Sequence, residues 1–236
     1  MDNGRAPHIF PRMSNETGVI IAGGGLNGTA LAVALASSGL RVTLVEPRTS
    51  ETRESDAFDG RSYALSLGSQ RLLKALDLWA AVAETTQPIL DIKITDGKPG
   101  GPTSPMVLEF DHAEIEEGPM GHMVEDRYLR RALLAAVAAS DRITAVTGHT
   151  IEDHTATASG VTATLEDGTE LVARLLVGCD GKTSATATRA GIKRQGWSYG
   201  QTSLVCAIAH EKPHHGVAPP YFLPAGPLAI RALKDN

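Results

Sequence analysis

The feature that most constrains this sequence is a short apolar run that leads directly into three spaced glycines. Residues 19–22 read Val-Ile-Ile-Ala, and Gly23, Gly25 and Gly28 follow in the spacing Gly-x-Gly-x-x-Gly. Residues 29–38 are rich in Ala and Leu and contain no Pro, which predicts a helix. A β-branched run, a glycine turn and a helix in succession are typical of the first unit of an α/β protein.

A second apolar strand is predicted at residues 41–45, and it ends at Glu46. Strand, glycine turn, helix, strand and acidic residue in this order form the dinucleotide-binding fingerprint. Gly23 allows the tight turn, Gly25 lets the backbone approach a pyrophosphate, and Gly28 lets helix and strand pack closely. The Glu46 carboxylate is expected to accept hydrogen bonds from both hydroxyls of an adenosine ribose. The alternative is a glycine-rich turn of some other α/β protein.

Composition places the chain among ordinary globular proteins. It has 236 residues, 42% hydrophobic and 21% charged, enough for one large domain or two small ones. The net charge of −5 gives no signature of nucleic-acid binding. Cys179 and Cys206 lie in apolar runs without a CxxC partner, so we expect reduced core residues in a cytoplasmic protein. No apolar run is long enough for a membrane span, and the first sixteen residues lack the apolar region of a signal peptide.

Several segments after Glu46 carry further expectations. Residues 47–59 are polar and predict a surface loop, which is followed by Arg61. Arg61 is interpreted either as a cation near the cofactor phosphates or flavin ring, or as a solvated loop arginine. Residues 89–95 and 106–110 predict two antiparallel strands of a separate, inserted sheet. Asp126 opens a third helix, for which it is a good N-cap.

The second half of the chain alternates between strand and turn signals. Asp167-Gly168 predicts a hairpin, and the apolar run after it ends at Asp180-Gly181, where a buried parallel strand meets a cofactor crevice. Residues 197–210 alternate and predict a long strand of the second sheet. His210, His214 and His215 suggest a metal site, but a proline-containing loop explains them better, so we predict no metal.

Six further segments, taken with the glycine fingerprint, resemble the class A flavoprotein monooxygenases. They are Asp59-Gly-Arg-Ser-Tyr-Ala-Leu, Val124-Glu-Asp-Arg, Gly178-Cys-Asp-Gly-x-x-Ser184, Trp197-Ser-Tyr-x-Gln201 and His210-Glu-x-Pro-His214 with Phe222-Leu-Pro-x-Gly-Pro227. The resemblance is strongest to the ubiquinone-biosynthesis branch, the octaprenyl-methoxyphenol hydroxylases, and covers nearly all of the chain after residue 17.

The resemblance implies a role for each candidate site residue. Gly23, Gly25 and Gly28 would bind the pyrophosphate of FAD, and Glu46 would bind its adenosine ribose. Arg61 and Asp126 would lie at the flavin end of the cofactor. Asp180 and Gly181 match a second FAD motif, which in the family is also linked to NAD(P)H. The implied reaction is reduction of FAD by NAD(P)H, capture of O₂ and hydroxylation of a polyprenylated phenol. The resemblance implies a location in the cytoplasm, and it leaves open a peripheral association with the inner membrane or with a multi-enzyme complex. No catalytic side chain is assigned.

Three departures from the family pattern limit this expectation. Ala187 stands where the second motif usually has Arg, and Asp126 stands where the family usually has an amide. The family's third motif, a Gly-Asp segment that binds the ribityl chain and phosphate of FAD, is missing, which indicates C-terminal truncation. The alternatives to a hydroxylase are therefore a truncated, non-catalytic remnant that binds a partner, and an NAD-dependent dehydrogenase built on the same fingerprint.

The predicted fold is α/β, with a Rossmann-like FAD-binding domain and an inserted antiparallel substrate sheet that is incomplete at the C-terminus. We expect a flexible tail at residues 1–15. The FAD-binding domain is predicted at 16–80 and 120–190, and the partial substrate-binding sheet at 81–119 and 191–236.

Overall fold

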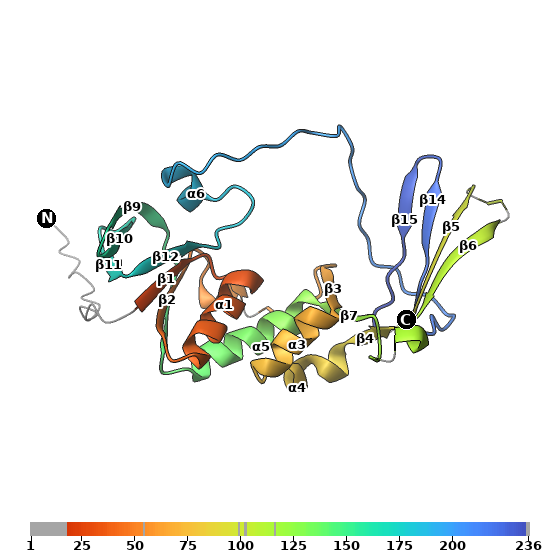
Figure 1. Cartoon of the computed structure of the whole chain (residues 1–236), viewed down its shortest axis with the longest axis horizontal. Coiled ribbons are helices and arrows are strands. Elements are labelled where there is room, and N and C mark those ends of the chain that lie inside the picture. The colour runs from red at the N-terminus through yellow and green to blue at the C-terminus, as the bar shows by residue number, and fades with distance from the viewer. Residues whose placement is uncertain (1–17, 54, 99, 102, 116, 235–236) are drawn as a thin grey trace, which may run out of the picture. The chain divides into compact units, whose positions relative to one another are not determined.

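The computed structural model describes residues 18–234 apart from 54, 99, 102 and 116 (Figure 1). The chain divides into two compact units, of which unit 1 comprises Met1–Arg53 and Val137–Gly196 and unit 2 comprises Glu54–Ala136 and Trp197–Asn236. The expected tail at residues 1–15 lies outside the described residues, and the assignment of domains by cofactor and substrate stays a prediction.

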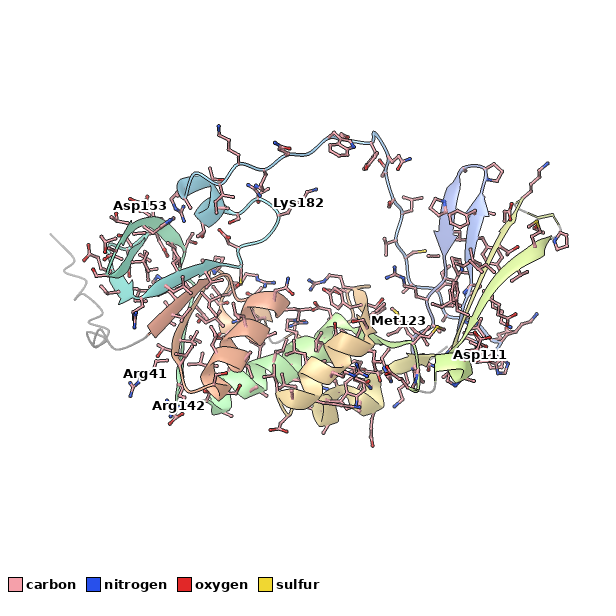
Figure 2. All side chains as sticks on the ribbon, viewed as in Figure 1. Arg41, Asp111, Met123, Arg142, Asp153 and Lys182 are labelled. Atoms are coloured by element: carbon pink, nitrogen blue, oxygen red, sulfur yellow. The ribbon has the colours of Figure 1, made fainter. Side chains whose placement is uncertain are left out.

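Unit 1 is built on a parallel four-stranded sheet with the order β12-β1-β2-β8. Its strands are β1 (Gly18–Ala22), β2 (Arg41–Glu46), β8 (Ile143–Thr147) and β12 (Leu175–Gly178). Ile20 of β1 lies opposite Thr43 on one side and Leu176 on the other. The apolar strands β1 and β2 are buried almost throughout, as strands covered on both faces are. Arg41 lies at the exposed start of β2 (Figure 2).

Both faces of this sheet are covered within unit 1. Helix α1 (Leu26–Ser37) contacts β1, β2 and β8 from one face (Figure 1). An antiparallel sheet of β9 (Ile151–Thr157), β10 (Gly160–Leu165) and β11 (Glu170–Ala173) packs its apolar side chains against Ile20 and Val45 on the other face. Strands β10 and β11 are joined by the hairpin predicted at Asp167-Gly168. The short helices are α2 (Ser50–Arg53) and α6 (Ala185–Arg189).

Helix α1 begins three residues earlier than predicted from composition, at Leu26 instead of Thr29. The second half of the glycine motif therefore forms the first helical turn. Gly28 lies inside this turn because the close packing there leaves no room for a larger residue, although glycine is a poor helix former in general.

Unit 2 contains two sheets and several helices. One sheet has the order β3-β7-β4, with β3 (Ser62–Ser66), β7 (Gly121–Glu125) and β4 (Gln87–Ile89). The other has the order β13-β5-β14-β15 with β6 paired to β5, and its strands are β13 (Val217–Ala218), β5 (Asp91–Gly97), β14 (Pro220–Leu223), β15 (Gly226–Ala229) and β6 (Thr103–Asp111). The helices are α3 (Leu67–Ala75), α4 (Trp79–Val82), η1 (Ala83–Thr85), η2 (His112–Ile115) and α5 (Asp126–Ala139), whose residues from Val137 onward belong to unit 1. The predicted antiparallel pair is confirmed as β5 and β6.

The long strand predicted at residues 197–210 is wrong. This segment has no strand partner among the described residues, and Trp197, Tyr199, Leu204 and Ile208 are each at least 76% exposed. Alternation of apolar side chains fits a strand, but the strand forms only where a neighbour accepts and donates its backbone hydrogen bonds. Cys206 is exposed for the same reason, which corrects its expected place in the core, whereas Cys179 is half-buried.

Candidate functional site

The glycine turn after β1 is closed on two sides by backbone. Gly23 has a φ of 101°, and a Cβ at this residue would lie 2.4 Å from the carbonyl oxygen of Cys179. A Cβ on Gly28 would lie 1.9 Å from the carbonyl oxygen of Gly23. Side chains cannot be accommodated at such distances, so the turn and the close helix packing both need glycine.

Gly25 differs because its surroundings are open. A Cβ built on Gly25 would meet no heavy atom within 4 Å. Gly25 is also the N-cap of α1, and no side chain caps the helix there. The first N–H groups of a helix have no partner within the helix and carry partial positive charge. This end of α1 therefore fits the pyrophosphate of a dinucleotide.

Glu46 is buried at the end of β2, with only 4% of its surface exposed. Its Oε2 accepts a hydrogen bond from Gly24 N–H at 2.7 Å, and its Oε1 accepts from Arg48 Nε at 2.7 Å and Arg48 N–H at 3.2 Å. Burial by itself raises the pKa of Glu46, but the hydrogen bonds from Arg48 and Gly24 outweigh it and hold the pKa below its ordinary value.

The Glu46 carboxylate is therefore ionised at neutral pH and already accepts three hydrogen bonds from the protein. A carboxylate has about four acceptor positions, so binding both ribose hydroxyls requires Arg48 to turn aside. The Arg48 side chain is 46% exposed and has room to do so. The ribose-binding role of Glu46 stays a prediction.

Arg53 is a functional candidate that the sequence reasoning missed. Residues 47–59 were expected to form a surface loop, but they contain α2, and Arg53 at its end is only 4% exposed. Its Nη2 donates to the Gly24 carbonyl at 2.6 Å and to Thr29 Oγ1 at 3.4 Å. The surface-loop prediction is wrong for this residue because a long-range contact with the glycine turn, invisible in the local composition, buries the guanidinium.

Asp180 and Gly181 follow β12 beside the glycine turn, since a Cβ on Gly23 would lie 2.9 Å from Asp180 Cα. The Asp180 carboxylate accepts from the Ser184 hydroxyl and from Thr186 N–H at 2.9 Å, and Ser184 is the N-cap of α6. Burial by itself raises the pKa of Asp180, but these hydrogen bonds lower it below its ordinary value. The carboxylate thus organises the first turn of α6, and its contact with a cofactor stays a prediction.

Arg61 and Asp126 form an ion pair within unit 2, with 3.2 Å between Arg61 Nη2 and Asp126 Oδ2. The Asp126 side chain is 4% exposed and also accepts from Tyr63 OH at 2.8 Å and Arg130 Nε at 2.9 Å. Arg61 is half-exposed and bonds Asp59 as well, and this hydrogen bond raises the pKa of its guanidinium. Tyr63 was not singled out in the sequence, because only pairing of β3 with β7 brings it to Asp126. Arg130 lies four residues after Asp126 on α5, so its ion pair is local and the helical spacing could have indicated it.

The predicted site residues therefore form two clusters, one in each unit. Unit 1 holds Gly23, Gly25, Gly28, Glu46, Asp180 and Gly181, and unit 2 holds Arg61 and Asp126. Each cluster combines a fixed charge with backbone or side chains that hold it in one orientation, as a preorganised binding site does.

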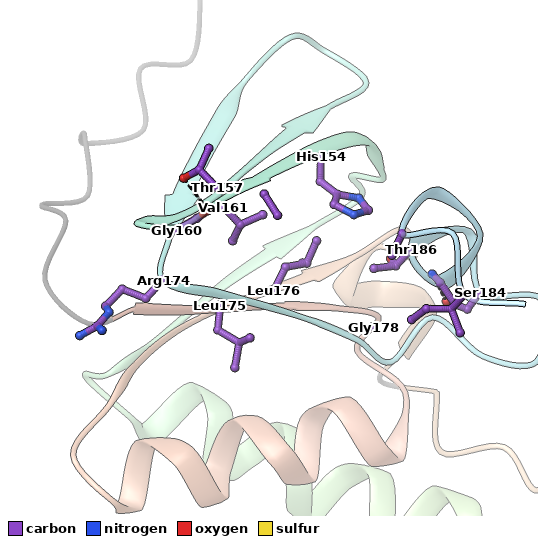
Figure 3. A pocket seen from close by; sticks show the side chains of 14 residues that line it. His154, Thr157, Gly160, Val161, Arg174, Leu175, Leu176, Gly178, Ser184 and Thr186 are labelled. Carbon is purple, nitrogen blue, oxygen red and sulfur yellow. Dashed lines mark hydrogen bonds between the residues drawn. The ribbon is translucent and has the colours of Figure 1, made fainter.

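Each unit also contains a cavity. In unit 1 a cavity of about 350 Å³ lies between the β9–β11 sheet, the edge strand β12 and α6, and Figure 3 shows Val161, Leu176, His154 and Thr186 around it. In unit 2 a cavity of about 260 Å³ is lined by Ile89, Ile92 and Met123 among others. Both are predominantly apolar, which suits the packing of an apolar group rather than of a charged one.

Among the described residues, one group of titratable side chains is close enough together to hold a metal ion. Asp91, Asp111 and His112 offer ligand atoms within 4.8 Å of one another, where β5 begins, β6 ends and η2 starts. The histidines at 210, 214 and 215 do not join such a group among the described residues, and they lie in a loop outside the strands. Exposed acidic groups of this kind are common without an ion, so the cluster adds nothing to the site.

Within the part of the chain that the structure describes, no helix is long and apolar enough to cross a membrane.

The chain matches one protein family over most of its length and is similar to several known proteins. Residues 16–221 match the family described as FAD binding domain. The chain is 41% identical over 218 residues to ubiquinone hydroxylase UbiL of Rhodospirillum rubrum, a match that covers 92% of this chain and 49% of that protein. It is 33% identical over 228 residues to 3-demethoxyubiquinol 3-hydroxylase of Escherichia coli, covering 95% and 56%. The chain thus spans about half the length of the curated relatives it matches.

The fold also recurs among solved structures. PqsL of Pseudomonas aeruginosa, described as a probable FAD-dependent monooxygenase, superimposes with a TM-score of 0.63 at 22% identity, over 78% of this chain and 48% of that chain. At this identity the likeness shows the fold alone, and it confirms the predicted mixed α/β architecture.

Proposed function

Because this chain belongs to the FAD binding domain family, we propose that it binds FAD and forms the cofactor-binding part of a hydroxylase of ubiquinone biosynthesis. One observation carries the proposal, namely that the open, uncapped start of α1 at Gly25 lies beside the buried, ionised carboxylate of Glu46. The names of the relatives from Rhodospirillum rubrum and Escherichia coli support hydroxylation as the reaction.

In this proposal, backbone N–H groups and a carboxylate at the glycine turn bind different parts of FAD. The N–H groups at the start of α1 bind the pyrophosphate, because an anion is stabilised at the positive end of a helix. Glu46 accepts the ribose hydroxyls, and Asp180-Gly181 lies beside the same turn. FAD, when bound, supplies the redox chemistry, and the protein supplies position and a site that excludes water.

We assign the flavin side and the substrate to unit 2. Arg61 is held by Asp126 and Asp59 and remains half-exposed, so it can face the negative charge of a phosphate or a reduced flavin. The cavity lined by Ile89, Ile92 and Met123 suits an apolar ring or chain. The proposed substrates are a polyprenylated phenol, O₂ and NAD(P)H. NAD(P)H gives two electrons, one oxygen atom enters a ring C–H bond, and the other leaves as water.

A second function, a non-catalytic binding protein, is favoured by the exposed apolar side chains. Leu204 and Val205 are 95% and 84% exposed, and Met106 on β6 is 79% exposed. Apolar surface of this kind marks an interaction site when it is contiguous.

The deciding experiment is a titration of the purified 236-residue chain with FAD and, in parallel, with NAD⁺. The hydroxylase proposal expects saturable FAD binding, seen as quenching of flavin fluorescence and a shifted visible band, with NAD⁺ binding more weakly. Binding of NAD⁺ alone would favour the dehydrogenase alternative. Binding of neither cofactor, by a chain that is folded by circular dichroism, would favour the binding protein.

A further inference from the structure

The Gly24 backbone is held between two buried charges. Its N–H donates to Glu46 Oε2 at 2.7 Å, and its carbonyl accepts from Arg53 Nη2 at 2.6 Å and from Thr29 Oγ1 at 2.8 Å. A Cβ on Gly24 would lie 3.1 Å from Arg53 Nη2 and 3.2 Å from Glu46 Oε2, so both charged groups contact this residue. Arg53 and Glu46 are each 4% exposed.

This arrangement fixes a peptide that would otherwise rotate easily. Gly23, Gly24 and Gly25 are consecutive, and glycine allows φ and ψ combinations that other residues avoid. The Gly24–Gly25 peptide therefore meets little steric resistance to flipping. Two donors, Arg53 and Thr29, converge on its carbonyl oxygen and hold it on one side.

Fixing the carbonyl also fixes the next amide. In a planar trans peptide the N–H points opposite to the C=O, so Gly25 N–H is directed away from the Arg53 guanidinium. Gly25 is the N-cap of α1 and has open space around its Cα. A guanidinium stays charged at every physiological pH, so the restraint and the positive charge behind the turn are permanent.

We propose that Arg53 is a positioning residue of the cofactor turn, which presets the Gly24–Gly25 peptide before the pyrophosphate binds. The inference rests on the proposed binding of FAD at this turn. It assigns a role to a side chain that need not contact the cofactor, because the effect passes through the Gly24 carbonyl. A merely structural arginine would change the stability of unit 1 without changing the amide that faces the ligand.

The test compares Arg53→Met and Arg53→Ala with the wild-type chain and with Arg41→Ala. Arg41→Ala removes the same charge from an exposed site in the same unit and should leave FAD affinity within twofold of wild type (Figure 2). Arg53→Met keeps most of the volume and should weaken FAD binding at least tenfold while the circular dichroism stays native. In Arg53→Ala, added guanidinium ion should restore most of the affinity, and sodium ion at equal ionic strength should not.

A second readout does not depend on FAD. In the wild-type chain without cofactor, the Gly25 amide should give one sharp NMR signal, and in Arg53→Met this signal should broaden or double because the peptide flips. Wild-type affinity in a folded Arg53→Met variant, failure of guanidinium to rescue Arg53→Ala, or failure of both variants to fold would overturn the inference. If the wild-type chain binds no FAD, the proposed function fails, and the Gly25 signal still tests the restraint.

Discussion

At the scale of single residues, the hydrogen bonds that Glu46 makes within the protein compete with its proposed binding of a ribose. Its carboxylate holds the glycine turn through Gly24 N–H and holds the side chain of Arg48. A ribose that enters would have to replace Arg48, because too few acceptor positions are left for two hydroxyls. Under the proposed role of Glu46, cofactor affinity would therefore depend on how easily the half-exposed Arg48 leaves the carboxylate.

We predict that Glu46→Ala weakens FAD binding by about 2–3 kcal/mol, or roughly 30- to 150-fold, because charge-assisted hydrogen bonds to the ribose and to Gly24 N–H are lost. Fluorescence titration with FAD measures the change. Glu51→Ala, which removes an exposed carboxylate of α2, is the matched control and should bind like wild type. An unchanged affinity for Glu46→Ala would remove the residue from the site.

Substitution of Gly25 should affect cofactor binding, whereas substitution of Gly28 should affect the stability of the fold. Gly25→Val should abolish FAD binding and leave the fold nearly intact, since the added atoms enter open space that a pyrophosphate would fill. Gly28→Ala should instead lower the free energy of unfolding by at least about 1–3 kcal/mol, because its Cβ meets the Gly23 carbonyl. Circular dichroism melts and flavin content distinguish the two. A Gly25→Val variant that keeps its flavin would show that this turn does not face the phosphates.

At the scale of elements, β7 carries a buried histidine whose protonation opposes folding. His122 is 8% exposed and packs edge-on against Trp79 of α4, with ring centroids 4.9 Å apart. Burial lowers the pKa of His122 below its ordinary value, and the charge of Lys74 on α3 lowers it further. The strand therefore packs best with a neutral imidazole.

We predict that the free energy of unfolding of unit 2 falls as the pH drops below about 6.5, the ordinary pKa of histidine. In that range the unfolded chain binds a proton that the folded chain does not, so acid favours unfolding, and above it the contribution of His122 is constant. Carboxylates with a lowered pKa, such as Asp180, act only at more acidic pH.

The measurement is the melting temperature between pH 7.5 and 5. His122→Phe keeps an aromatic ring against Trp79 without a titratable nitrogen and should flatten this pH dependence, while His210→Gln, a change in an exposed loop, should not. An equal acid sensitivity in His122→Phe would mean that another group is responsible.

At the scale of the whole molecule, apolar surface dominates two regions of unit 2. The sheet that contains β5 and β6 exposes Met106, Leu108 and Phe110, and the segment from Trp197 to Ile208 exposes its large apolar side chains. The longer relatives have about as much chain again outside the matched region. Exposed apolar side chains gathered on one strand and one segment favour another surface that covers them.

We therefore predict that the 236-residue chain forms no hydroxylated product from a polyprenyl phenol, NADPH and O₂, whereas a chain extended to the length of its relatives does. A flavin site that water enters loses reducing equivalents to peroxide before substrate is oxidised. Product and peroxide are quantified separately, with Gly25→Val of the extended chain as the cofactor-free control. Product formed by the short chain in proportion to NADPH consumed would contradict this expectation.

The sequence by itself determined the features that depend on local chemistry. The glycine turn, the strands on either side of α1 and the hairpin at Asp167-Gly168 follow from sterics and alternation over a few residues, and the structure confirms them. The place of Glu46 at the end of the buried strand β2 was predictable for the same reason. Asp180 lies two residues after β12, as a parallel strand at that place predicted, but β12 is only partly buried and not the buried strand that was expected.

Only the tertiary structure decided which side chains surround these features. Arg53 is buried on the Gly24 carbonyl, and Tyr63 donates to Asp126, through contacts between residues far apart in the chain. The segment from Trp197 to His210 has the alternation of a strand but no partner among the described residues. A strand edge or a buried charge is stable only when a distant group supplies its hydrogen bonds, and local sequence does not identify that group.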